Sequence, residues 1–271
     1  MIDAIILGGG TLKDSKDTTI SKALIKIDKK PMIEYVVDAL RESPSIGRIV
    51  ALVPADAQSE SWVSKVDDVL LAKDFIANIR AGLDSLGSKT DASSKVFLTS
   101  CDIPLVSPEA IEDFISRCHR EEAEIYYAII PKDVIMARYP ETKRTYATLR
   151  EGTFTGGNVS LVSPTALQNN FELLEKAYNL RKSPFKLVQT LGFNFIIKFV
   201  SRRLSLADAE KRVTNLLDAR GKAIATPYPE IGIDVDKQVD LELVQKVIKR
   251  TKKEKSSAKS EEREAKVGKQ T

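Results

Sequence analysis

The sequence predicts an α/β fold in which a mostly parallel central sheet is flanked by helices. Short β-branched apolar runs alternate along the chain with longer segments whose apolar residues recur at helical spacing. Around residues 144–163 strand-like runs follow one another without a helix between them, which predicts an antiparallel excursion. The 271 residues, 42% of them hydrophobic, are enough to bury a sizeable core in one large domain.

The first part of the chain alternates strictly between the two kinds of element. IDAIIL is typical of a buried strand, and the helix that follows it carries apolar residues such as Ile33, Val36 and Leu40 on one face. Ser107 precedes the last helix of this part as an expected N-cap. The expected elements, in order, are strand 2–7, helix 31–41, strand 48–53, helix 75–86, strand 95–99 and helix 108–118.

The second part contains an expected helical insertion at 183–220. This segment is unusually apolar around its phenylalanines, and Ser205 with Asp208 comes close to a capping box that would begin a helix. The other expected elements are strands 124–130, 146–150, 159–162, 223–226 and 231–235, and helix 239–248. The domain therefore spans 1–248, and the tail 249–271, which lacks apolar periodicity, is expected to be disordered or to fray from the last helix.

Composition and charge limit the classes of partner. The 42 basic residues face 38 acidic ones, giving a net charge of +4, so the sequence does not demand a nucleic-acid partner, while small anionic ligands remain open. The two cysteines, Cys101 and Cys118, are interpreted as packing residues. No stretch resembles a signal peptide or a transmembrane helix, and a reducing, cytoplasmic compartment is the expectation. The apolar helices 185–204 are interpreted as subdomain core, with peripheral membrane contact as the alternative.

The glycine loop after the first strand, LGGGTLKDSK, is a candidate anion site. Backbone without Cβ atoms lets N–H groups approach phosphate oxygens, and the lysines that follow add positive charge. A tight strand-to-helix turn is the alternative interpretation. The loop lacks the Gly-Lys-Ser/Thr ending of the P-loop and the G-x-G-x-x-G spacing of dinucleotide-binding folds.

Carboxylates follow two of the expected strands. In VFLTSCDIPL, Asp102 comes just after a buried strand, and in EIGIDVDKQVD, Asp234 and Asp236 come at the end of another. Such positions suit a divalent metal at the ligand-binding edge of a parallel sheet. A turn aspartate before proline is the alternative for Asp102 alone.

The order LGGG, then SKAL with KP, then CDIPL, FTGGN and IDVDKQVDLE resembles the MobA-like (molybdopterin-guanylyltransferase-like) nucleotidyltransferases, relatives of the sugar-phosphate nucleotidylyltransferases. The resemblance spans residues 1 to about 248. It implies a Rossmann-like α/β domain of the glycosyltransferase-A type. It also implies an Mg²⁺-dependent reaction in which NMP passes from an NTP to a phosphorylated small-molecule acceptor (a sugar, polyol or cofactor phosphate), with release of pyrophosphate.

The resemblance also implies roles for particular residues. Lys22 and Asp102 would be catalytic, with Lys22 at the phosphates, and the metal would be held by Asp102 and Asp236, for which Asp234 is a substitute. The nucleotide would be bound by Leu7, Gly8, Gly9, Gly10, Lys13 and Lys22, and the acceptor by Arg144, Gly156, Gly157 and Asn158. Asn78 and Arg80 match a weaker motif for base or ribose contacts.

The chain departs from the family pattern in the glycine loop. Where the family has an arginine and then Pro-Lys, this chain has a longer loop in which Lys13 or Lys16 would take the role of the arginine, and Ser21 replaces the proline. Lysine lacks the bidentate fork of arginine, so NTP specificity and turnover are the properties in question. A nucleotide-sugar-dependent glycosyltransferase and a nucleotide-binding protein without catalysis are the alternatives; the oligomeric state would be monomer or homodimer.

An acceptor pocket is expected near the segment KRTYATLREGTF. Lys143, Arg144 and Arg150 would receive the phosphate of the acceptor, with Tyr146 and Phe154 against its body. A solvated antiparallel hairpin is the alternative.

Overall fold

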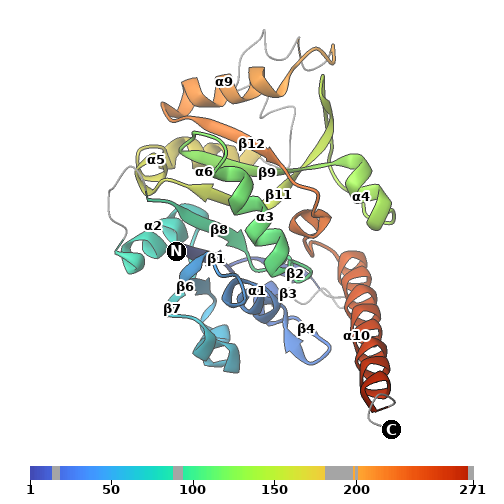
Figure 1. The fold of residues 1–271 in the computed structure, drawn as a ribbon. Coiled ribbons are helices and arrows are strands. Elements are labelled where there is room, and N and C mark those ends of the chain that lie inside the picture. Colours follow the sequence, from blue (N-terminus) through green and yellow to red (C-terminus); the bar gives the residue numbers. More distant parts are fainter. Residues whose placement is uncertain (14–18, 88–93, 181–197, 199–200, 268–271) are drawn as a thin grey trace.

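A computed structural model describes residues 1–13, 19–87, 94–180, 198 and 201–267. Its centre is a single sheet with the strand order β12-β9-β11-β8-β1-β6-β7, and β10 pairs with β11 (Figure 1). The strands are β1 Ile2–Leu7, β6 Ile46–Val53, β7 Asp68–Leu71, β8 Val96–Ser100, β9 Ile125–Pro131, β10 Ala147–Leu149, β11 Gly152–Val162 and β12 Gly221–Ala225. Two small hairpins, β2 (Thr11–Lys13) with β3 (Thr19–Ser21) and β4 (Lys26–Ile27) with β5 (Lys30–Pro31), follow the first strand.

The expected parallel sheet with an antiparallel excursion is confirmed. β1 pairs in parallel with both β6 and β8, β6 with β7, and β12 with β9. β11 runs antiparallel to β8 and β9, and β10 antiparallel to β11. The chain builds outward from β1 through β6 and β7, then returns to place β8 on the other side of β1. This reversal is a topological switch point, where α/β sheets bind their ligands.

Helices cover both faces of the sheet (Figure 1). α1 (Met32–Arg41) and α3 (Pro108–Cys118) pack on a core that includes Phe97 and Phe114. α2 (Phe75–Leu86) and α6 (Phe171–Leu180) pack on the opposite face with Ile5 and Leu98. The other helices are α4 Lys132–Arg138, α5 Pro164–Gln168, α9 Leu206–Leu217 over β12, and α10 Gln238–Val267.

Local signals in the sequence act as expected at helix starts. The Ser107 side chain accepts a hydrogen bond from the amide of Ala110 and so caps α3. Ser205 and Asp208 form a complete capping box at the start of α9, with Asp in the place usually taken by Glu or Gln. Most of the apolar part of the expected 183–220 insertion lies outside the described residues; α9 is the helix described within it.

The expected strand 231–235 is wrong. The structure has a 3₁₀ turn, η4 (Pro229–Gly232), followed by an extended run that pairs with no strand of the described chain. The apolar alternation that suggested a strand is real, because Ile231, Ile233 and Val235 are all buried. Burial of every second residue indicates an extended backbone packed against a core, but it does not show that the segment pairs with another strand.

The C-terminal helix is longer than the sequence pattern suggests. α10 continues to Val267, through the tail expected to be disordered, and extends beyond the body of the molecule (Figure 1). Its first turns pack through Leu241, Val244 and Ile248. The remainder is rich in Lys, Glu, Arg and Ala, which have high intrinsic helix propensity even without an apolar face. No helix in the described parts of the chain is both long and apolar enough to cross a membrane.

Candidate functional site

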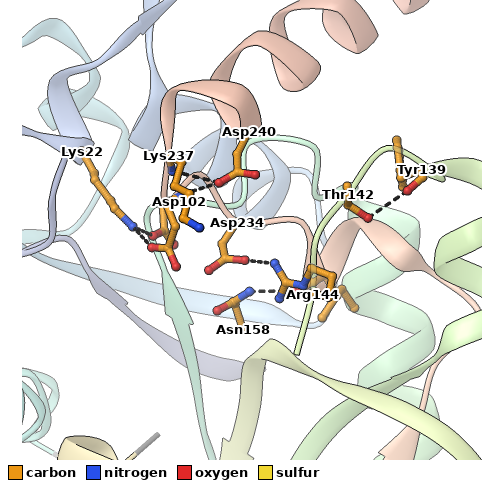
Figure 2. Close-up of polar contacts among 11 residues, drawn as sticks. Lys22, Asp102, Tyr139, Thr142, Arg144, Asn158, Asp234, Lys237 and Asp240 are labelled. Carbon is orange, nitrogen blue, oxygen red and sulfur yellow. Dashed lines mark hydrogen bonds and ion pairs between the residues drawn. The ribbon is translucent and has the colours of Figure 1, made fainter. Parts of the chain in front are cut away.

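Loops and side chains from distant parts of the sequence meet at the carboxyl ends of β1 and β8. Gly8–Gly10 follow β1, Asp102 follows β8, and the amide of Cys101 donates to the carbonyl of Leu7 at 3.2 Å, which ties the two strand ends together. This edge is the switch point of the sheet, and it carries the charged cluster in Figure 2.

The three glycines of the loop have different tasks. The amide of Gly8 donates to the carbonyl of Leu52 at 2.7 Å, and a Cβ at Gly8 would stand 2.8 Å from a methyl of Val53. Gly8 therefore extends the sheet. Its amide is committed to Leu52 and is not available to a ligand, contrary to the expectation from the sequence. Gly9 and Gly10 are exposed, and their amides form no hydrogen bond with the described residues. The anion-binding interpretation thus applies to these two amides.

Lys22 connects the glycine loop to the carboxylates. Its amide donates to the carbonyl of Gly10 at 2.9 Å. Its side-chain stem packs against Gly10, because a Cβ placed there would be 3.3 Å from Lys22 Cδ. Its Nζ donates to Asp102 Oδ2 and to Asp236 Oδ1, at 2.6 Å in each case (Figure 2). Burial works against the charge, but the two carboxylates outweigh it and raise the pKa of Lys22 above its ordinary value.

Asp234 and Asp236 reach this cluster from an extended segment rather than from a strand end. Buried Ile233 and Val235 alternate with them, so both carboxylates leave the core face. The amide of Val235 donates to the carbonyl of Asp102 at 2.9 Å, which ties the segment to the loop after β8. Asp240, in the first turn of α10, accepts the amide of Asp236 at 3.1 Å and fixes the turn that follows.

The three aspartates fit a divalent cation. Ligand oxygens of Asp102, Asp234 and Asp236 lie within 4.8 Å of one another. Asp102 is 9% exposed, and its Oδ1 is buried with no hydrogen-bond partner among the described residues. A buried oxygen without a hydrogen-bond partner destabilises the folded state unless a ligand binds to it. Carboxylate oxygens are the ligands that Mg²⁺ prefers. The expected pair Asp102 and Asp236 is brought together, and Asp234, expected as a substitute for Asp236, joins it.

Arg144 lies on the other side of Asp234. Its guanidinium donates to Asp234 Oδ1, and both side chains are 17% exposed (Figure 2). Burial raises the pKa of Asp234, Arg144 opposes this effect, and Asp102 adds to it. Lys143 and Arg150, the other basic residues of the expected acceptor pocket, are exposed, and Arg150 lies in the turn between β10 and β11. Arg144 alone of the three joins the charged cluster.

Gly156, Gly157 and Asn158 lie in β11, which begins at Gly152, before the start of the expected strand 159–162. The pairing of β11 with β9 is irregular between Gly156 and Ser160, so the stretch is a distorted part of the strand. Asn158 Nδ2 donates to the carbonyl of Ile231 at 3.4 Å, which helps to hold the segment that leads to Asp234. Gly156 makes room for Tyr127 of β9, a residue that the sequence analysis missed.

Asn78 lies next to Gly9 of the glycine loop, whereas Lys22 lies next to Gly10. Its Oδ1 accepts the amide of Lys73 at 2.6 Å, and its Nδ2 is 3.5 Å from where a Cβ of Gly9 would be. Asn78 is 5% exposed, so it positions the 72–74 loop. Arg80 instead stacks over the ring of Phe171, 4.6 Å from its centroid. Lys13 lies in β2 directly after the glycines, and Lys16 is outside the described residues.

Comparison with known proteins relates the chain to a family of NTP transferase domains. The family model described as the MobA-like NTP transferase domain matches residues 4–181. A curated relative, the probable molybdenum cofactor guanylyltransferase of Flavobacterium johnsoniae, is 31% identical over 124 residues. That match covers 46% of this chain and 60% of the relative, so the chain spans less than two thirds of the length of the relative.

Solved structures extend the similarity to most of the chain. A hypothetical transferase from Thermus thermophilus is 33% identical, with a TM-score of 0.74, and the match covers 89% of this chain and 99% of that one. The 2-C-methyl-D-erythritol 4-phosphate cytidylyltransferase of Francisella tularensis has a TM-score of 0.54 at 12% identity, over 89% of this chain and 97% of that one. At that identity the likeness concerns the fold alone.

Proposed function

The chain belongs to the family of MobA-like NTP transferase domains, and from this premise we propose that it is a nucleotidyltransferase that moves NMP from an NTP to a phosphorylated small molecule. The observation that carries the proposal is the cluster of Lys22 with Asp102, Asp234 and Asp236 at the switch point. Beside it, the amides of Gly9 and Gly10 bond to no described residue. This arrangement suits a reaction whose reactants are both anionic.

The nucleotide side of the site is formed by the glycine loop and Lys22. The amides of Gly9 and Gly10 would donate to the triphosphate, and Gly8 would hold the loop on β6. The Lys22 ammonium would leave its carboxylates for the phosphates as the NTP enters, since the stem of the side chain already lies against Gly10. Leu7 and Lys13, at either end of the glycines, would border the same site.

The three aspartates would hold the divalent cation. When bound, the cation neutralises charge on the phosphate oxygens. Three aspartates face two basic side chains of the described chain, Lys22 and Arg144, so this part of the site carries a negative charge that suits a cation. Asp234 is shared between this cluster and Arg144, which connects the cation site to the acceptor side.

Transfer would proceed by direct displacement. An oxygen of the acceptor phosphate forms a bond to the α-phosphorus, and the bond from that phosphorus to the bridging oxygen of pyrophosphate breaks, with the electron pair leaving on pyrophosphate. Arg144 would orient the acceptor, and Gly156, Gly157 and Asn158 would shape the strand beside it. The described chain needs to supply alignment and charge, but no nucleophile of its own.

Pyrophosphate release tests the proposal. The four NTPs are each incubated with Mg²⁺ and with sugar phosphates, polyol phosphates or pterin cofactors. We expect release that requires one NTP and one acceptor together, and that is lost in Asp102→Ala but kept in Asp113→Asn, which alters a surface ion pair of α3. If NTP binds but no acceptor gives release, the protein binds nucleotide without catalysis; if a nucleotide sugar is consumed instead, it is a glycosyltransferase.

Asn78→Ala is expected to impair NTP binding in particular. The change leaves the amide of Lys73 without its acceptor, which typically costs about 1–3 kcal/mol of stability, and it loosens the loop beside Gly9. The KM for the NTP should rise while the KM for the acceptor stays the same, as steady-state kinetics would show. Asn170→Ala is the matched control, because the side-chain amide of Asn170 also bonds the backbone, but it donates to carbonyls and joins α5 to the end of α9. An equal rise in the control would refute a specific role for Asn78.

A further inference from the structure

Tyr127 is an exposed aromatic residue whose ring reaches over Gly156 of the neighbouring strand β11. It lies in β9 with 46% of its surface exposed, whereas its neighbour Tyr126 is buried on the other face. A Cβ at Gly156 would stand 2.3 Å from the Tyr127 hydroxyl and 3.2 Å from its Cζ. The absence of a side chain at Gly156 is therefore what lets the end of the Tyr127 ring lie across β11.

The hydroxyl end of Tyr127 lies in the field of the cluster. Burial of this end raises the pKa of Tyr127, Arg144 opposes the rise, and Asp234 adds to it. The register of the sheet agrees with this, because Phe154 of β11 pairs with Ala147 of β10 on one edge and with Pro131 of β9 on the other. The segment from Arg144 to β10 therefore approaches β11 from the edge opposite to β9, near Gly156. A tyrosine hydroxyl can donate a hydrogen bond to an acceptor at this place. The residue is half exposed at the same time, so it offers a ligand both a polar hydroxyl and an apolar ring surface.

Two tyrosine hydroxyls that feel the charge of Arg144 have no hydrogen-bond partner among the described residues. The hydroxyl of Tyr127 bonds to no residue in the described chain, and the hydroxyl of Tyr146, which also feels the charge of Arg144, is buried without a partner there. Arg144 itself donates from one terminal nitrogen to Asp234. A guanidinium has five N–H groups, so others remain that can donate to a ligand. A buried donor such as the Tyr146 hydroxyl is normally satisfied. Together with the Tyr127 hydroxyl and the remaining N–H groups of Arg144, it suits an acceptor of hydrogen bonds that comes from outside.

We propose that Tyr127 is a specificity-determining residue for the acceptor, whose anionic phosphate is held by the Tyr127 hydroxyl together with Arg144 and whose cyclic body lies on the exposed Tyr127 ring. A phosphate monoester has enough oxygens to accept from the arginine fork and a hydroxyl at once. A ring-shaped body, such as a sugar or a heterocycle, gains contact area on an aromatic face. Because Arg144 touches Asp234, a phosphate here lies next to the cation site.

This inference rests on the proposed function for its biological meaning, but it is tested by binding alone. The probe is phenyl phosphate, followed by ligand-observed NMR on the parent, Tyr127→Phe, Tyr127→Ala and the control Tyr126→Phe. Tyr126 is the matched tyrosine on the opposite face, where its hydroxyl bonds the backbone at Glu121 and Ala123. Phenol, which lacks the phosphate, and a non-hydrolysable NTP analogue are titrated in parallel.

We expect Tyr127→Phe to weaken phenyl phosphate binding about tenfold, the usual effect of losing a hydrogen bond to a charged group. Tyr127→Ala should weaken it further because the ring is lost, Tyr126→Phe should match the parent, and phenol should bind no more than weakly to any variant. The affinity for the NTP analogue should be the same in all four proteins.

Three results would overturn the inference: no saturable binding of phenyl phosphate to the parent, equal binding by the parent and Tyr127→Phe, or a loss confined to the NTP analogue. The last would assign Tyr127 to the triphosphate. Failure of the proposed function gives a different pattern, in which phenyl phosphate depends on Tyr127 but no acceptor yields pyrophosphate.

Discussion

Replacing Asp102 by asparagine is expected to lower turnover by about 10²- to 10³-fold, the usual effect of removing one preorganised electrostatic contact from an active site. The substitution keeps the size of the side chain but removes the charge that faces Lys22 at 2.6 Å. It also replaces one of the two carboxylate oxygens by an NH2 group, so the side chain can no longer bond Lys22 through one oxygen and offer the orphaned one to a cation. Steady-state pyrophosphate release, measured with the acceptor identified in the screen, gives the effect on turnover.

The control for this change is Asp113→Asn. Asp113 also pairs with a basic residue, but on the surface of α3, where such pairs contribute little. Thermal unfolding of both variants would show that each is folded at the assay temperature. Turnover of Asp102→Asn within threefold of the parent would remove Asp102 from the catalytic site.

Lys22→Met is expected to bind Mn²⁺ more tightly than the parent when no nucleotide is present. In the described structure the ammonium of Lys22 lies between Asp102 and Asp236, so it competes with a cation for their oxygens. Loss of a charge-assisted bond of this kind corresponds to about a tenfold change in affinity. Electron paramagnetic resonance of free Mn²⁺ during a titration would measure it.

The same variant should be less stable until metal is added. Asp102 and Lys22 are buried, and removal of one partner from a buried pair costs about 3 kcal/mol, the lower end of the usual range because Asp236 is half exposed. Mn²⁺ should then stabilise the variant more than the parent, because the stabilisation by a ligand increases with the logarithm of its affinity. Turnover should fall in spite of the tighter metal binding, since no ammonium remains for the phosphates.

Lys65→Met is the matched control for Lys22. Lys65 also bridges two carboxylates, those of Glu34 and Asp38, at 2.6 and 2.8 Å, but far from the switch point and more exposed. Its removal should leave Mn²⁺ affinity unchanged. Equal or weaker Mn²⁺ binding by Lys22→Met than by the parent would mean that the ammonium does not occupy the cation position.

The sequence was sufficient for the parts of the fold that depend on local pattern. β1, α2 and α3 have the bounds expected from apolar runs, periodicity and caps, and Asp102 follows its strand as predicted. β7 was missed because Asp68–Leu71 is short and only partly buried. The segment at 231–235 was misassigned because buried alternation occurs in any extended chain against a core.

The site was predictable only where its residues follow local signals. Gly8–Gly10, Lys22 and Asp102 stand in recognisable motifs, whereas the commitment of the Gly8 amide to Leu52 depends on a neighbouring strand. The role of Tyr127 depends on its position across from Gly156 in another strand, and that of Asp234 on Arg144, 90 residues away. Contacts of this kind follow from sheet register, which local pattern does not specify.

The central claim, that Asp102 and Asp236 share one divalent cation beside the nucleotide, is tested most directly by counting Mn²⁺ bound per chain in the presence of a non-hydrolysable NTP analogue. The account predicts one tight site in the parent and in Asp113→Asn, and at least tenfold weaker binding in Asp102→Asn and in Asp236→Asn. The same number of ions bound with the same affinity in all four proteins would contradict it.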